Sequence, residues 1–308
     1  MKIKKYLSLA TLLLSIGIYS CSKEDNKITP ETTTQTYTPR LSNDTSSAYI
    51  SQVLDYTPAP GQFINTSIGT DTSAKGIIGK PVSNMISLGA FGGYVIFQFD
   101  HSIQDTTGAD LAIYGNPYNG WSEPGIVLVS YDANNNGIAD DSWYELAGSN
   151  YDSTTTIKNY SVTYYNPNKY ANVPWKDNQG NKDSVLVNAF HLQNYYPLFA
   201  NNQDSITFTG SLLPKTITTN GFVKNLGFSW GYSDSYSTGL DPNGYDNYSK
   251  NQYNSFDIGW ARDSSGKSIT LKYIDFVKVY TGQLANGGSL GEVSTEVKGA
   301  ADLHILNK

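Results

Sequence analysis

Hydrophobic and polar residues alternate with a period of two in several parts of this chain. These segments are rich in β-branched and aromatic residues, and clusters of Gly, Asn, Asp and Pro separate them, which is typical of strands joined by turns. They are residues 94–100, 109–115, 125–132, 161–165, 205–210 and 274–282. One segment, residues 47–56, shows a weak spacing of apolar residues that favours a helix instead.

The pattern predicts an all-β fold, an antiparallel β-sandwich of jelly-roll type with long aromatic-rich loops. All-β sandwiches reach roughly 200–250 residues as a single domain. We therefore expect residues 48–308 to form one ligand-binding domain.

The N-terminus has the features of a secretory signal. Lysines in the first five residues precede an apolar stretch, residues 6–18, that is too short to span a bilayer stably. Residues 1–20 are therefore predicted to be a lipoprotein signal peptide, with an N-terminal anchor helix as the alternative. Cys21 stands where the lipobox cysteine would be, although Tyr19 replaces the usual small residue. Acyl chains on Cys21 would attach the protein to a membrane through lipid alone.

Residues 21–47 are rich in Thr, Ser, Asn and Pro and are predicted to be a lipid-anchored flexible tether. The acidic run at residues 22–26 resembles the export signal of surface lipoproteins of the phylum Bacteroidota; a charged linker is the alternative. We expect the protein at the cell surface, on the outer membrane.

Composition excludes two classes of function. Cys21 is the one cysteine, so the predicted mature domain has neither disulfide bonds nor thiol catalysis. The formal net charge is −6 and the lysines and arginines are scattered, unlike a basic nucleic-acid-binding stripe.

The stretch YDANNNGIADDSWYEL, residues 131–146, has oxygen-bearing side chains at the spacing of a calcium loop. Calcium binds six to eight oxygens, which a tight turn with a glycine at the sixth position can supply. Trp143 stands where an EF-hand has its bidentate glutamate, so the shell would be completed by Asp141 or Glu145. The alternative is a metal-free hairpin held by Asn and Asp side chains. The candidate ligands, for a structural calcium ion, are Asp132, Asn134, Asn136, Ile138 through its carbonyl, Asp140 and Asp141.

A second candidate metal cluster is Asp110, Asn116 and Glu123, although its spacing is generic. The chain also contains 24 tyrosines and 5 tryptophans, and most of them are expected to fill strand faces. Some stand in polar, loop-like contexts where exposed aromatics beside amides would favour a ligand surface. The candidate ligand contacts are Tyr118, Trp121, Trp175, Trp230 and Tyr232.

Several blocks along the domain resemble a family of Bacteroidota cell-surface lipoproteins associated with outer-membrane corrinoid (cobalamin) uptake. The resemblance implies a protein that captures a corrinoid and hands it to an outer-membrane transporter. The blocks are residues 53–65, 87–103, 114–149, 273–282 and 290–297. Residues 92–103 together with 109–116 also resemble a wider group of secreted jelly-roll domains with a calcium site.

Three functions remain open at this stage. Capture of a corrinoid is the first; a glycan-binding surface protein of the same architecture is the second, because sugar rings stack on the same aromatics. One wide pocket would favour the corrinoid, and a strip of coplanar aromatics the glycan. A secreted hydrolase is the third, but the sequence has no distinguishing carboxylate pair and no G-x-S-x-G motif, and His101, His191 and His304 lack metal-ligand spacing. We therefore expect a binding protein without enzymatic activity.

Overall fold

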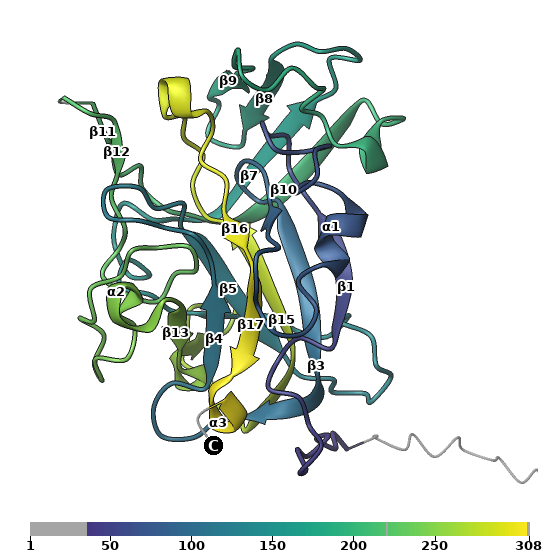
Figure 1. Cartoon of the computed structure of the whole chain (residues 1–308), viewed down its shortest axis with the longest axis vertical. Helices are drawn as coiled ribbons and strands as arrows, with labels where there is room; N and C mark the ends of the chain where they lie inside the picture. The colour runs from purple at the N-terminus through teal and green to yellow at the C-terminus, as the bar shows by residue number, and fades with distance from the viewer. Residues whose placement is uncertain (1–35, 220, 307–308) are drawn as a thin grey trace, which may run out of the picture. The chain divides into compact units, whose positions relative to one another are not determined.

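A six-stranded antiparallel sheet runs through the computed structural model, which describes residues 36–219 and 221–306 (Figure 1). The predicted signal peptide, Cys21 and the acidic run after it lie outside the described residues. The strand order is β1-β3-β15-β5-β6-β14. Their bounds are β1 Gln52–Thr57, β3 Tyr94–Gln104, β15 Tyr273–Thr281, β5 Gly125–Ser130, β6 Tyr144–Leu146 and β14 Ala261–Arg262.

Smaller antiparallel sheets accompany it. A four-stranded sheet has the order β10 (Ser205–Leu212), β7 (Ile157–Tyr165), β8 (Val173–Asp177) and β9 (Lys182–Val185). A three-stranded sheet has the order β13 (Asn254–Phe256), β4 (Leu111–Tyr114) and β17 (Gly299–Asp302). Two strand pairs join β11 (Ile217–Thr218) to β12 (Lys224–Asn225) and β16 (Glu296–Val297) to β2 (Ile86–Ser87).

The helices are short. They are α1 (Asp71–Lys75), α2 (Tyr248–Asn251) and α3 (Leu303–Leu306), with 3-10 turns η1 (Leu198–Ala200), η2 (Ile258–Trp260) and η3 (Gly288–Leu290). Within the described part of the chain, none of the helices has the length and apolar character needed to cross a membrane.

The all-β prediction is confirmed, and each of the six alternating segments contains a strand: β3, β4, β5, β7, β10 and β15. The helical expectation for residues 47–56 is wrong, because this segment leads into β1 and pairs with β3. The register of that pair shifts between Val53 and Asp55. An irregularity of this kind changes the phase of the alternation, so that Ile50, Val53 and Tyr56 fall three residues apart and imitate a helix.

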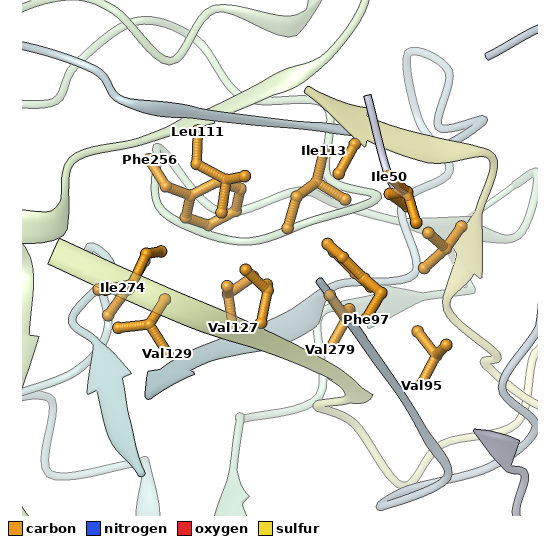
Figure 2. Packing of buried hydrophobic residues seen from close by; sticks show 14 of the residues in the cluster. Ile50, Val95, Phe97, Leu111, Ile113, Val127, Val129, Phe256, Ile274 and Val279 are labelled. Atoms are coloured by element: carbon orange, nitrogen blue, oxygen red, sulfur yellow. The ribbon is translucent and has the colours of Figure 1, made fainter. Parts of the chain in front are cut away.

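One face of the six-stranded sheet packs against the three-stranded sheet and forms the first core. Figure 2 shows Val127, Val129 and Val279 of the large sheet opposite Leu111 and Ile113 of β4. All five side chains are fully buried. This face-to-face packing is the sandwich that the alternation of the strands predicts.

The opposite face of the same sheet contributes to a second core. Ile126 of β5 and Tyr280 of β15 belong to a cluster that includes Tyr160 and Val162 of β7 and Phe208 of β10. Successive residues of β5 therefore enter different cores, which explains the nearly uninterrupted apolar run in this strand.

The segment before β1 is bound to the domain. Contacts with the domain begin before residue 48, the start expected from composition. The Tyr37 and Tyr131 rings meet edge to face at 5.0 Å, and the Arg40 guanidinium lies 3.3 Å from the Asp275 carboxylate. Composition missed this contact because two long side chains provide it, in a segment otherwise poor in large apolar groups.

Asp275 joins several parts of the chain. It is 3% exposed and lies where the β15–β3 register shifts between Ile274 and Phe276. Its carboxylate accepts hydrogen bonds from the Ser102 hydroxyl at 2.6 Å and from the Asp132 backbone N–H at 2.9 Å, in addition to Arg40.

His101 connects β3 to β17 through a buried ion pair. Its ring is 1% exposed, with Nδ1 2.6 Å from Asp100 Oδ1 and Nε2 2.8 Å from Asp302 Oδ2. Both partners are acceptors, and a neutral imidazole has one N–H, so the cationic ring satisfies both bonds. Burial lowers the pKa of His101, but the bonds to Asp302 and Asp100 outweigh it and the pKa is raised.

We expect His101→Gln to lower the free energy of unfolding by roughly 3–5 kcal/mol at pH 5.5, because breaking a buried ion pair leaves uncompensated charge. A raised pKa means that this stabilisation is complete below the unfolded imidazole value and is lost as pH rises through the folded value. The difference in unfolding free energy between His101→Gln and the unsubstituted chain should therefore narrow at alkaline pH. Urea unfolding from pH 5.5 to 10 measures it.

His191→Gln is the control, because the His191 ring packs edge to face on Phe63 at 4.8 Å rather than on a carboxylate. A His101→Gln difference that stays constant over the pH range would contradict a buried cationic ring.

Candidate functional site

An open cleft of about 660 Å³ lies between the six-stranded sheet and the four-stranded sheet. Strands β5, β6, β14 and β15 contribute residues from one side, and β7 and β10 from the other. Aromatic, charged and hydroxyl-bearing side chains share its lining. They include Leu128, Trp143, Glu145, Tyr151, Lys158 and Arg262.

Alternation along β15 explains how polar groups reach the cleft. Val277 and Val279 point into the first core, so Lys278 and Tyr280 between and after them line the cleft. The Tyr280 hydroxyl donates to the Ser211 carbonyl at 3.1 Å and accepts from the Ser211 N–H at 2.8 Å. Gly210 makes room for this ring, because a Cβ there would come within 2.7 Å of the Tyr280 hydroxyl oxygen.

Two of the charged groups in the cleft, Lys158 and Glu145, form an ion pair. Lys158 Nζ lies 3.2 Å from Glu145 Oε1 and 3.2 Å from the centre of the Tyr151 ring, a cation–π contact. The Ser211 hydroxyl donates to Glu145 Oε2 at 2.6 Å. Burial lowers the pKa of Lys158 although Glu145 opposes the change, and burial raises the pKa of Tyr151 to about 12. The cleft thus offers aromatic faces beside donors and acceptors that are already held in place.

The five predicted ligand contacts do not form one surface, and none of them lines this cleft. Trp121 and Tyr232 are 7% and 2% exposed, so the expectation that these two rings are exposed is wrong. The Trp230 ring packs on Trp260 at 4.7 Å, and Trp175 lines a separate pocket of about 60 Å³. Tyr118 is 58% exposed.

The loops that carry these aromatics satisfy their own polar groups. Tyr118 and Trp121 exchange two backbone hydrogen bonds of 2.9 Å, which closes a tight turn. The Trp121 ring then fills the space beside Gly287, where a Cβ would approach it to 2.4 Å. The Tyr232 hydroxyl accepts the Asn150 N–H at 3.1 Å. The backbone of the turn is therefore satisfied by its own bonds, and the Trp121 and Tyr232 rings are part of the interior.

A signal for the cleft was present in the sequence. Lys278 interrupts the apolar alternation of residues 274–282, and Glu145 follows two aromatic residues in the strand after the predicted calcium loop. Polar residues within otherwise buried strands indicate a site where the sheet is not fully covered.

The predicted calcium loop folds with its side-chain oxygens turned toward its own backbone. Asp132 accepts the Asn136 N–H at 2.9 Å and the Gly137 N–H at 2.7 Å. Asn134 accepts the Asn136 N–H at 3.0 Å, and Asn136 accepts the Ile138 N–H at 2.7 Å. Gly137 has a φ of 75°, the left-handed conformation that favours glycine.

The second half of the loop closes the turn. Asp141 accepts the Ala133 N–H at 3.0 Å, and the Asp140 carboxylate oxygens lie 3.3 Å from the Asn136 side-chain amide. Asn135 accepts the Thr38 N–H at 2.9 Å, which ties the loop to the N-terminal segment. Among the described residues, two clusters of three carboxylates have oxygens within 4.8 Å of one another, and both clusters lie outside this loop. Calcium in this loop remains a prediction.

The second predicted metal cluster is divided between two places. Asp110 precedes β4 and Asn116 follows it. The two ends of a four-residue strand are roughly 13 Å apart. Asp110 lies with Asp105 and Asp257, whereas Glu123 lies with other carboxylates. The predicted grouping is wrong because residues close in sequence are held apart by an extended strand.

The Asp110 group already has cationic and N–H partners. The His304 ring nitrogen Nε2 lies 2.9 Å from Asp110 Oδ1, and the Ile258 N–H donates to Asp110 Oδ2 at 2.8 Å. A hydrogen bond to Asp110 raises the pKa of His304, and burial raises the pKa of Asp257 to about 6. These contacts hold the start of β4, η2 and α3 together and indicate a structural role.

Glu123 belongs with Asp234 and Glu296. One oxygen of each carboxylate lies within 4.8 Å of the other two. Asp234 and Glu296 are 1% and 2% exposed, and Glu123 is partly exposed. Burial raises the pKa of all three groups, and mutual repulsion adds to the effect for Asp234 and Glu296. No sequence pattern indicates this group, since its members come from distant segments.

No protein-family model matches the chain, and a search of curated proteins finds no match. Function is therefore inferred from the residues that line the cleft and from the resemblance of the sequence blocks.

Proposed function

We propose that this protein is a surface-exposed lipoprotein that captures a corrinoid in the cleft and delivers it to an outer-membrane transporter. The resemblance of the sequence blocks to lipoproteins associated with corrinoid uptake supports the ligand class. The observation that carries the proposal is the broad cleft, about 660 Å³, with aromatic and hydrogen-bonding groups on its walls.

The chemistry of the cleft suits such a ligand. A corrinoid is broad, largely neutral and fringed with amides, so it needs apolar faces together with donors and acceptors. Trp143 and Tyr151 supply aromatic surface, and Arg262 and Ser265 supply donors. The ion pair between Lys158 and Glu145 fixes two further polar groups in position. A prearranged site of this kind reduces the entropy lost on binding.

Glycan binding is the second candidate. The cleft is also lined by the carboxylates of Asp152 and Asp263 and by the hydroxyl-bearing Ser264, Ser265 and Thr156, which are groups that sugar hydroxyls can bind. The aromatics do not form a row, since Trp143 and Tyr151 share the cleft while Trp175 and Trp230 lie elsewhere. This arrangement favours one compact ligand over an extended sugar chain.

We propose binding without catalysis. Glu145, the carboxylate best placed in the cleft, is neutralised by Lys158 and bonded to Ser211, so it is held as an acceptor. We also propose that calcium in the 132–141 loop has a structural role, in which the turn already formed by Asp132 and Gly137 is completed by the ion.

Trp143→Ala should weaken binding of cyanocobalamin about ten-fold or more, a loss of roughly 1.4 kcal/mol, because a ring in the cleft is removed. Trp175→Ala is the matched control, since this ring lines the separate small pocket and its loss should leave affinity unchanged. Isothermal titration of both variants measures the effect. Equal affinities of the two variants for cyanocobalamin would place this ligand outside the cleft. Binding of oligosaccharides instead of cyanocobalamin would favour the glycan.

Chelation should lower the melting temperature if calcium completes the loop, and added Ca²⁺ should restore it. Each kcal/mol of binding free energy is worth roughly 2–4 °C for a domain of this size. Asp132→Ala should give a folded but less stable protein. Its melting temperature should lack the part of the calcium-dependent rise that comes from this loop. Differential scanning calorimetry with EDTA and then CaCl₂ measures it. A calcium response in Asp132→Ala as large as in the unsubstituted chain would contradict the site.

Surface exposure predicts that protease added to intact cells digests the protein. Immunoblotting before and after lysis measures the accessible fraction, with a periplasmic protein as the protected control. Protection of this chain until the cells are lysed would place it in the periplasm.

A further inference from the structure

Three carboxylates from distant parts of the chain converge inside the domain. Glu123 precedes β5, Asp234 lies in the long loop between β12 and α2, and Glu296 begins β16. One oxygen of each is within 4.8 Å of the others. All three are far apart in the sequence, so tertiary packing alone brings them together.

Backbone N–H groups orient these carboxylates. Asp234 Oδ1 accepts the Asn116 N–H and Oδ2 accepts the Glu296 N–H, each at 2.8 Å. Glu123 Oε1 accepts the Ser294 N–H at 3.0 Å. Hydrogen bonds of this kind favour the ionised form of a carboxyl group. Burial opposes ionisation, so the site is built for negative charge that the protein interior disfavours.

The decisive observation is an oxygen without a hydrogen-bond donor. Glu296 is 2% exposed, and among the described residues no N–H or hydroxyl group donates to its Oε1. The charged groups that act on this side chain are Glu123, Asp234 and Glu292, all acidic, and a hydrogen bond between the Glu296 and Glu123 carboxyl groups would need a proton that one of them holds. A buried carboxylate oxygen without a donor is unfavourable unless a cation or a proton compensates it.

The charges around the site favour a divalent ion. Lys298 is the cationic group that acts on Asp234. This one lysine stands against the three carboxylates and the neighbouring Glu292, an excess of acidic groups that a divalent cation would offset. Gly115 keeps the approach to Asp234 open, because a Cβ there would come within 2.5 Å of Asp234 Oδ1.

We propose that Glu123, Asp234 and Glu296 bind a divalent cation, and that the ion is Ca²⁺. The ligand atoms are carboxylate oxygens, which calcium and magnesium prefer, and the set contains no His or Cys for zinc. Calcium accepts an irregular shell of protein oxygens, whereas magnesium keeps several waters, for which a buried site has little space.

The ion would join the turn that contains Trp121, the loop from β12 to α2 and strand β16. It shares no ligand with the 132–141 loop, so the two sites can be tested separately. This inference is independent of the ligand proposed for the cleft.

The test is calcium titration of the purified full chain after EDTA treatment, followed by isothermal calorimetry. Glu296→Gln keeps the shape of the side chain and removes its charge, and Asp132→Ala is the control at the other site. We expect Glu296→Gln to bind one calcium ion fewer than the unsubstituted chain, or to bind it at least ten-fold more weakly. Asp132→Ala should keep this ion.

Melting curves provide the second readout. In EDTA, Glu296→Gln should melt no lower than the unsubstituted chain, because one repelling charge is gone. With CaCl₂ the order should reverse, because the unsubstituted chain gains the ion. Unchanged calcium stoichiometry and affinity in Glu296→Gln would overturn the proposal and assign the site to shared protons.

If Glu296→Gln does not fold, Glu123→Gln replaces it, since Glu123 is the partly exposed member. The same loss of one ion is expected, and the same unchanged titration would overturn the site. Loss of calcium binding in Asp132→Ala alone would support the loop and count against this cluster, so the two proposals fail in different ways.

Discussion

The rest of the structure depends on burial of the six-stranded sheet on both of its faces. Val127 and Val129 enter one core while Ile126 enters the other, so a single strand contributes to two hydrophobic clusters. The one cysteine of the chain precedes the domain, so disulfide bonds do not contribute to its stability. Apolar burial, at roughly 25 cal/mol per Å², therefore has to offset most of the conformational entropy of the long loops.

Incomplete coverage of this sheet also creates the cleft. The four-stranded sheet covers Ile126 and Tyr280, but Lys278 and Glu145 lie where the two sheets diverge. Polar side chains can occupy these strand positions because they face an open space. The fold and the candidate ligand site thus have one origin. Strands with regular hydrogen bonds supply half of the cleft's lining residues, and the loops beside them, which carry Trp143 and Tyr151, supply the other half.

Local alternation was sufficient to predict the fold class and the six strands β3, β4, β5, β7, β10 and β15, because side-chain direction in a strand depends on neighbouring residues alone. It missed shorter strands such as β6, β13 and β17, which have too few residues to show a period. It failed at Val53, where an irregularity in the pairing changes the phase and cannot be read from the strand itself. The candidate sites were harder to predict. Asp110 and Glu123 are close in sequence but separated by an extended strand, whereas Glu123 and Glu296 meet through tertiary packing. The prediction that Trp121 and Tyr232 are exposed failed because polar residues next to an aromatic do not indicate where its ring points, and these two rings fill the interior.

The contact between Arg40 and Asp275 has a mechanical consequence. Asp275 also accepts hydrogen bonds from Ser102 and Asp132, and it lies in β15, an interior strand of the large sheet. A pulling force applied at residue 36 would first load the contacts of Tyr37 and Thr38 with Tyr131 and Asn135, and then the Arg40–Asp275 contact. Through Asp275 the force would pass into β15, whose neighbours on both sides share the load. Tension would therefore reach the strongest part of the domain before it reached β1, the strand at the edge of the sheet.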